Sequence, residues 1–296
     1  MRKLIYFTAL IAMLSSCRGT DDEPDAWGNF ESREIMVVSE TAGKILSMEV
    51  QQGDQVNSGE IIAITDTAMI KLQLAELEAS RNSVMTKLNS IDAQNTIIDQ
   101  QISNLGVNIE RVESMLHDKA ATQKQLDDLT GQLRVLEKQK EANNTQKLTV
   151  RSELEVFNSR EAQLNEQLER CYIKSPSQGT VSEKYAEAGE ITAMGKALVR
   201  IADLENMELK VYISGAQLGE LKLGQECRVR IDRGEKDYSE YTGRLIHVSD
   251  KAEFTPKIIQ TKEERVHLVY AVKILVLNDG TLKNGMPAEA FFDSSN

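Results

Sequence analysis

Residues 70–91 read IKLQLAELEASRNSVMTKLNSI, and residues 150–171 read VRSELEVFNSREAQLNEQLERC. In both stretches, apolar side chains recur at alternating steps of four and three residues. The same step runs through residues 70–116 and again through residues 122–171. Such a 3.5-residue repeat is typical of a coiled-coil seam, sustained here for about seven heptads in each arm. No proline occurs between residues 24 and 176, so neither arm contains a proline that would break a helix.

The two arms are expected to fold back on each other between residues 118 and 121. This pairing places Asn95 opposite Asn143, and it leaves Arg81 one layer away from Glu161, which offers it a charged partner. The predicted object is an antiparallel α-helical hairpin whose arms are roughly 75 Å long at about 1.5 Å per residue. A hairpin of this kind is a spacer rather than an enzyme core.

Composition limits the classes of function. The chain has 296 residues, a formal net charge of −11 and 5% aromatic residues, so nucleic acid is not an expected partner. Its three histidines are scattered, and no nucleophile motif, phosphate-binding loop or metal-ligand cluster occurs. Cys171 and Cys227 lack ligand spacing and are interpreted as small buried hydrophobic residues. Neither catalysis nor a cofactor nor a metal is expected.

The first residues read as a targeting signal. Residues 1–16 contain two basic residues and then an apolar run that is too short to span a bilayer, as in a secretory signal peptide. The run ends in Leu14-Ser15-Ser16-Cys17, which resembles the lipobox of bacterial lipoproteins. That resemblance implies acylation of Cys17, which would hold the protein on a membrane. An ordinary leader with an incidental cysteine is the alternative.

A second pattern lies on both sides of the predicted hairpin. Three glycines, one serine and one acidic residue recur at a constant offset of 136 residues. The pairs are Gly43 and Gly179, Gly53 and Gly189, Gly59 and Gly195, Ser39 and Ser175, and Asp54 and Glu190. Glycines at this spacing mark tight turns between short strands. Neither half can bury a core alone, so we expect the two halves to close on each other, with chance coincidence of the glycines as the alternative.

Two such halves with a helical hairpin between them resemble the split biotinyl-lipoyl fold of the HlyD-like membrane fusion proteins, the periplasmic adaptors of tripartite export systems. Residues 254–257, 260–265 and 268–273, together with Gly285-Met286, also resemble that family, and within it the adaptors that serve ABC transporters. In lipoyl and biotin carriers, a modifiable lysine occupies the turn between the halves. The hairpin replaces that turn here, so a carrier function has no site.

The resemblance also implies a docking site at the hairpin tip. In the family, the tip carries Arg, then Leu four residues on, then Ser seven further, and it is inferred to engage the outer-membrane exit duct. Arg111, Met115 and Thr122 hold these spacings in this chain. The alternative is structural: a solvated Arg111, a Met115 that packs at the apex, and a Thr122 that caps the second helix.

The last hundred residues alternate apolar and polar side chains with a period of two, which predicts strands. We expect a half-open antiparallel barrel of five or six strands, joined by the strand near residues 34–38. The predicted fold is therefore mixed α+β and elongated. Its expected parts are a signal peptide (1–16), a lipidated N-terminus, tether and first strand (17–38), a first lipoyl-like half (39–66), the coiled-coil hairpin (67–171), a second lipoyl-like half (172–203) and the β-barrel (204–296).

Taken together, the resemblance implies a lipid-anchored periplasmic adaptor that couples an inner-membrane transporter to an outer-membrane efflux channel. Such adaptors work as rings, often of six copies. Whether ATP or a proton gradient drives the transporter stays open, as does the membrane, because Arg18 after Cys17 would favour outer-membrane sorting under enterobacterial rules. The alternative function is a coiled-coil spacer that cross-links envelope components without forming a conduit.

Overall fold

The computed structural model describes residues 23–234, 237–254 and 268–292. Its elements in chain order are β1 (Ala26–Val38), β2 (Gly43–Met48), β3 (Gln55–Val56), β4 (Ile61–Thr65), α2 (Ala68–His117), α3 (Gln123–Glu169), β5 (Tyr172–Lys174), β6 (Gly179–Lys184), β7 (Ile191–Thr192), β8 (Ala197–Ser214), the short 3-10 helix η1 (Gln217–Gly219), β9 (Glu226–Asp232), β10 (Tyr238–Phe254), β11 (Leu268–Leu277) and β12 (Pro287–Phe291).

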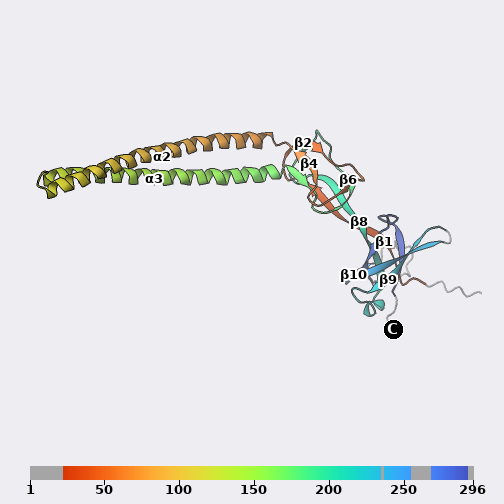
Figure 1. Ribbon diagram of the computed structural model, residues 1–296. Coiled ribbons are helices and arrows are strands. Elements are labelled where there is room, and N and C mark those ends of the chain that lie inside the picture. The colour runs from red at the N-terminus through yellow and green to blue at the C-terminus, as the bar shows by residue number, and fades with distance from the viewer. Residues whose placement is uncertain (1–22, 235–236, 255–267, 293–296) are drawn as a thin grey trace, which may run out of the picture.

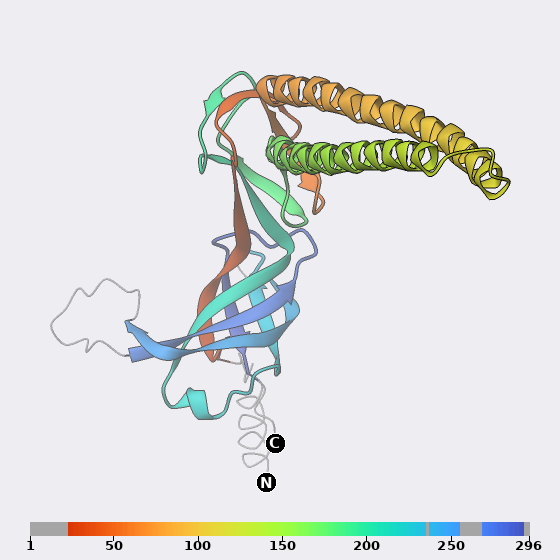
Figure 2. The ribbon, with the colours of Figure 1, turned by 90° about the vertical axis from the view of Figure 1, so that its left-hand side faces the viewer.

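Three parts follow one another in space. The hairpin of α2 and α3 leads into a β domain around β2, β4 and β6, and this domain leads into a barrel around β9 and β10 (Figure 1). In the turned view, the hairpin projects sideways from the line of the two β parts, which gives the molecule a bent outline (Figure 2). The predicted elongated α+β fold with an inserted helical hairpin is confirmed.

The two arms form one continuous helix each. Helix α2 spans 50 residues and α3 spans 47, and the turn between them covers residues 118–122, one residue more than predicted. Arg81 and Glu161 form the expected ion pair across the arms, with 3.6 Å between Nη1 and Oε2. The predicted pairing of Asn95 with Asn143 is wrong, because Asn95 Nδ2 donates to Oδ1 of Asn144 at 3.0 Å. Asn144 occupies the position that flanks the seam, and its side chain reaches across from there.

Two polar positions of the α3 seam, Lys140 and Lys147, have ion-pair partners on α2. Lys140 Nζ lies 2.5 Å from Oδ1 of Asp99, and Lys147 pairs with Asp92. These pairs bracket Asn95, which is 9% exposed and whose Oδ1 has no hydrogen-bond partner. Ion pairs therefore connect the two arms in the middle of the hairpin, but one buried acceptor, Asn95 Oδ1, has no hydrogen-bond partner.

The 136-residue repeat appears in the β domain as reciprocal backbone hydrogen bonds. Each bond from the first half to the second is matched by one in the opposite direction at the repeat offset. The matched bonds are Gly53 N–H to Val181 O (2.9 Å) with Gly189 N–H to Ile45 O (2.8 Å), and Gly59 N–H to Ser175 O with Gly195 N–H to Ser39 O (both 2.8 Å). The two halves therefore close on each other as one domain, as the sequence predicts.

The repeated glycines serve this domain in two ways. Gly53, Gly59, Gly189 and Gly195 have positive φ, which suits the turns they occupy, and Gly43 begins strand β2 with a φ of +152°. Gly179 instead lets two strands approach, because a Cβ there would lie 2.7 Å from Ile201 Cγ2 and 2.8 Å from the carbonyl oxygen of Ala202. Around these turns, the domain core gathers apolar residues from both halves, among them Ile45, Ile62, Ile173, Val181, Leu198 and Ile201.

The hairpin leaves and re-enters this domain at one point. Thr65 N–H donates to the carbonyl oxygen of Cys171 at 2.9 Å, and the Thr65 hydroxyl lies 2.7 Å from that of Thr41. Thr65 and Cys171 are both buried, which confirms the expected burial of this cysteine; Cys227 is buried in the barrel. The ends of a segment of about a hundred residues are thus held together by hydrogen bonds.

The barrel is closed rather than half-open, so that part of the sequence prediction is wrong. Strands β1, β12, β9, β10, β11 and β8 pair in this order, and β8 pairs back onto β1. The reason is that β1 already begins at Ala26 and β8 runs to Ser214, so both strands are long enough to serve the barrel and the lipoyl-like domain. The predicted tether therefore ends before Ala26. Gly28 permits this closure, because a Cβ there would lie 1.8 Å from the carbonyl oxygen of Lys210 on β8.

The hairpin gives a prediction about stability. Replacing Asn95 by Leu removes the buried unsatisfied oxygen and leaves Asn144 solvated, so the free energy of unfolding should rise by about 1 to 2 kcal/mol. The measurement is thermal unfolding followed by the helical circular dichroism of the mature chain.

The matched control is Asn89→Leu, an exposed position of α2. It should change stability by less than about 0.5 kcal/mol. A lower melting temperature for Asn95→Leu than for the unmodified chain would contradict the assignment of a destabilising seam amide.

Candidate functional site

The tip of the hairpin is the first candidate site. Arg111 is exposed and its Nη1 donates to Oδ1 of Asn108 at 3.3 Å, while Met115 is 41% exposed. Arg111 and Met115 are four residues apart in α2 and so lie on one face of the helix. Lys119, two residues past the end of α2 at His117, has a φ of +61°, and the following Ala120 N–H donates to the carbonyl oxygen of Met115 at 2.7 Å. The tip therefore presents one cationic and one apolar side chain from the end of α2, next to a short turn.

Thr122 begins the second arm. It is the N-cap residue of α3, and its N–H donates to Oε1 of Gln125 at 2.9 Å, while its hydroxyl lies 3.1 Å from the same oxygen. In this contact of a capping box, the side chain of Gln125 accepts the backbone N–H of the N-cap residue. The structural role expected of Thr122 is confirmed. Its role in docking stays a prediction, as do those of Arg111 and Met115.

Other predicted site residues fall elsewhere. The six glycines of the repeat lie in the lipoyl-like domain, where they shape turns and strand contacts. Cys17 and the leader lie outside the described residues, and so do residues 255–265 of the family-like stretch. Gly285 and Met286 lie next to β12 and bind the first strand, since Gly285 N–H donates to Phe30 O and Phe30 N–H to Met286 O. Gly285 and Met286, which belong to the family-like stretch, therefore help to close the barrel.

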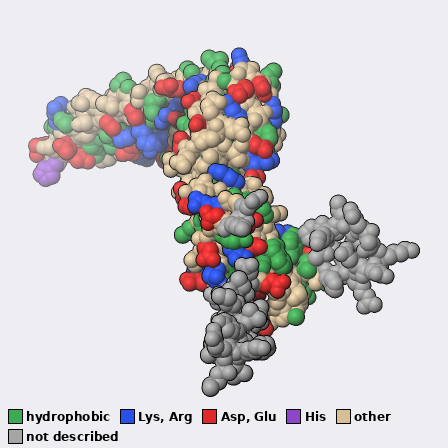
Figure 3. Space-filling model, turned by 90° about the vertical axis from the view of Figure 1, so that its right-hand side faces the viewer, with side chains coloured by type: hydrophobic (Ala, Val, Ile, Leu, Met, Phe, Trp, Pro, Cys, Tyr) green, Lys and Arg blue, Asp and Glu red, His purple; other side chains and the backbone are tan. Residues whose placement is uncertain are grey.

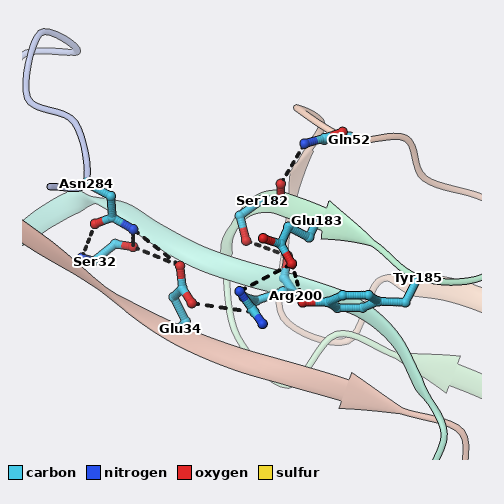
Figure 4. A network of polar contacts seen from close by, with 8 residues as sticks. All are labelled: Ser32, Glu34, Gln52, Ser182, Glu183, Tyr185, Arg200 and Asn284. Atoms are coloured by element: carbon cyan, nitrogen blue, oxygen red, sulfur yellow. Dashed lines mark hydrogen bonds and ion pairs between the residues drawn. The ribbon is translucent and has the colours of Figure 1, made fainter.

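The junction between the two β parts holds a polar network that the sequence did not reveal (Figure 4). Arg200 on β8 lies between two carboxylates, 3.5 Å from Glu34 of β1 and 3.3 Å from Glu183 of β6. Its guanidinium also covers the ring of Tyr185 at 5.5 Å. Tyr185 donates its hydroxyl proton to Glu183, and this hydrogen bond raises the pKa of the phenol.

The network continues into the barrel. Asn284, in the loop before β12, donates to Oε1 of Glu34 at 3.3 Å and accepts the backbone N–H of Ser32. Ser32 also marks a register shift between β1 and β8. Side chains from the lipoyl-like domain and from the barrel therefore meet where β1 and β8 pass from one to the other.

The described residues add no metal-binding cluster to these features. Across residues 23–234, 237–254 and 268–292, no group of three or more His, Cys, Asp or Glu side chains could hold a metal ion. On the face seen in Figure 3, acidic and basic side chains are interspersed, without a broad area of one sign. Among the described helices, none is both long and apolar enough to cross a membrane.

Comparison with known proteins gives a consistent family. A family model described as "CzcB-like, barrel-sandwich hybrid domain" matches residues 33–203, more than half of the chain. A UPF0194 membrane protein of Yersinia enterocolitica is 24% identical and is aligned over 98% of each chain. A UPF0194 membrane protein of Enterobacter is 25% identical over 90% of this chain and 88% of its own.

A solved structure shares the fold. MacA from Actinobacillus actinomycetemcomitans matches with a TM-score of 0.56 and 21% identity, over 90% of this chain and 76% of its own. The family model ends at residue 203, within β8, and the match to MacA extends the shared fold to 90% of the chain.

The junction network generates a prediction. Replacing Arg200 by Met keeps an apolar stem but leaves Glu34 and Glu183 as neighbouring like charges, so thermal stability should fall by about 1 kcal/mol. Lys196→Met is the control, because it breaks one ion pair, to Glu190, at a more exposed position. Equal melting temperatures for the two variants would show that the network does not stabilise the junction.

Proposed function

The chain belongs to the family with the CzcB-like barrel-sandwich hybrid domain, and from this premise we propose that it is a periplasmic adaptor of an export system. It would link an inner-membrane transporter to an outer-membrane efflux channel. The observation that carries the proposal is the hairpin inserted into the lipoyl-like domain. Its ends are hydrogen-bonded at Thr65 and Cys171, and its tip lies at the far end of two unbroken helices.

The shape supports a linking role. Helix α2 alone, with 50 residues, spans roughly 75 Å at about 1.5 Å per residue. The barrel lies at the opposite end of the molecule from the tip (Figure 1). A two-ended molecule of this length can contact one partner through the barrel and another through Arg111, Met115 and Thr122.

The finer assignments rest on the resemblance of the sequence. We assign the barrel end to the transporter. We favour an ABC-type transporter, because residues 254–257, 260–265 and 268–273, together with Gly285-Met286, resemble adaptors of that branch. The tip is assigned to the outer-membrane channel. Self-association into a closed ring, with six copies as the expected number, would use a head-to-tail contact between copies.

Acylation at Cys17 would place the adaptor on the periplasmic face of a membrane. Two observations support this anchoring: the lipobox-like stretch that ends at Cys17, and the description of the Yersinia and Enterobacter relatives as membrane proteins. Inner-membrane placement follows from the proposed transporter contact. A coiled-coil spacer without a conduit is the competing function, and it would require neither a transporter nor a channel.

The tip assignment predicts the effect of charge reversal. Arg111→Asp should abolish substrate efflux, since Arg111 would donate hydrogen bonds to the channel, while folding stays intact because an exposed charge reversal seldom unfolds a coiled coil. Efflux is measured in cells, and folding is measured by circular dichroism of the purified protein.

Arg134→Asp serves as the control for Arg111→Asp, since Arg134 is exposed on α3 away from the tip. It should leave efflux unchanged. Normal efflux in the Arg111→Asp strain would contradict the proposed contact of the tip with the channel and would favour the coiled-coil spacer.

Membrane attachment predicts a separate outcome. Cys17→Ser should lose acylation and leader processing at this site, so the mature protein should no longer be retained on membranes. The measurement is lipid labelling together with salt-washed membrane fractionation. Unchanged processing and retention would show that Cys17 is not the lipid anchor.

A further inference from the structure

The outer wall of the barrel carries one largely exposed tryptophan. Trp27 on β1 is the only tryptophan of the chain, and it is 58% exposed. Strand pairing places it between Tyr212 of β8 and Glu289 of β12. Residues two apart on a strand point to the same face, so Asn29 lies beside Trp27 on the outside of the barrel. The indole therefore forms a flat, apolar platform at the surface.

A pocket of about 360 Å³ lies beside this platform. We call it the tryptophan pocket. Besides Trp27, its lining includes Asn29, Tyr212, Arg230, Asp232 and Glu289. These residues come from β1, β8, β9 and β12, which the closed barrel brings side by side. The pocket is therefore a product of barrel closure, and it is separate from both the hairpin tip and the junction network.

One wall of the tryptophan pocket is fixed before any ligand binds. Nε and Nη2 of Arg230 each lie 2.8 Å from Oε2 of Glu289. The same guanidinium lies 4.5 Å from the ring centroid of Tyr238 and 4.6 Å from that of Phe291. A side chain that is already paired and stacked loses little further freedom when a ligand binds, so this wall is preorganised.

Two polar side chains of the pocket are available to a ligand. Asn29 and Asp232 are both exposed, and within the described part of the chain their side chains make no hydrogen bond or ion pair. The amide of Asn29 offers two donor hydrogens and one acceptor oxygen, and the carboxylate of Asp232 accepts through two oxygens. With Trp27 they present an apolar face and two planar polar groups to one ligand.

The charges of the pocket favour an uncharged ligand. Of the charged lining residues, Arg230 pairs with Glu289, which leaves Asp232 uncompensated, so an anion would meet a negative charge. Recognition of an organic cation takes a cage of aromatic rings. Of the two lining rings, Tyr212 already faces Lys210, whose Nζ lies 5.4 Å from the ring centroid, which leaves Trp27 alone. A neutral ligand with several hydroxyl groups meets neither obstacle.

We propose that the tryptophan pocket binds a neutral saccharide. The ring of Trp27 stacks on the apolar C–H face of one pyranose, while Asn29 and Asp232 form hydrogen bonds with its hydroxyl groups. A few placed polar groups beside an apolar surface are typical of a small-molecule site, and they discriminate by the hydroxyl groups that they bind. A glycan strand of the cell wall and a soluble saccharide share this chemistry. The binding goes beyond the proposed adaptor function and does not depend on it.

The fluorescence of Trp27 tests the proposal. Because the full chain has no other tryptophan, its emission reports on this pocket alone. Titration with tri-N-acetylchitotriose or with maltotriose should give a saturable blue shift, since a stacked sugar shields the indole from water. Tighter binding of tri-N-acetylchitotriose would support the proposal with cell-wall glycan as the source. Tighter binding of maltotriose would support it with a soluble saccharide as the source.

Substitutions in the pocket test the polar contacts. Asp232→Ala and Asn29→Ala should each weaken saccharide binding by about tenfold, because each removes a hydrogen-bonding group of the site. Asp250→Ala is the matched control, since Asp250 is also exposed but does not line the pocket. It should leave the affinity unchanged. Circular dichroism should show all three variants folded, because the three side chains face solvent.

Two results would overturn the proposal. One is the lack of a saturable shift with either saccharide, and a shift with tetramethylammonium alone would then assign the pocket to cations. The other is saccharide binding that is as tight in Asp232→Ala and Asn29→Ala as in the unmodified chain. Arg111→Asp should bind saccharides normally, so a failure of the adaptor function is distinguished from a failure of the pocket.

Discussion

The structure depends on the return of the chain to Thr65 after more than a hundred residues. The Thr65 N–H and the Cys171 carbonyl form a 2.9 Å hydrogen bond in a buried site, and this bond joins the first half of the lipoyl-like domain to the second. Neither half has enough apolar surface to fold alone. The hairpin must therefore have arms of nearly equal length, because a mismatch would separate the halves. The same closure makes both arms start from one point, so the hairpin can act as a stiff lever.

Stiffness continues on the other side of the domain through β1 and β8. Each of these strands contributes to two cores: Val37, Val199 and Ile201 pack in the lipoyl-like domain, while Phe30 and Leu209 pack in the barrel. The pairing of β1 with β8 shifts register at Ser32, and Arg200 bridges Glu34 and Glu183 near this point. A load on the hairpin tip can thus reach the barrel through paired strands rather than through a flexible linker.

The sequence predicts those features that repeat. The heptad step gave both arms, and the 136-residue offset gave the two halves that the reciprocal bonds of Gly53 and Gly189 join. The sequence does not predict features that depend on a single side chain or on the close approach of two strands. Closure of the barrel relies on Gly28, which lies in an acidic segment without strand alternation. The hydrogen bond of Asn95 depends on the side-chain amide of Asn144, which flanks the seam. The roles of Arg111, Met115 and Cys17 stay predictions.

We propose that this chain joins a transporter in one membrane to a channel in the other. Electron cryomicroscopy of the complex purified from cross-linked envelopes through a tag on this chain tests it most directly. The expected particle contains a ring of copies, with the barrels against an inner-membrane transporter and the hairpin tips against an outer-membrane channel. Particles in which the tips meet no membrane protein, or in which the barrels bind no transporter, would contradict it.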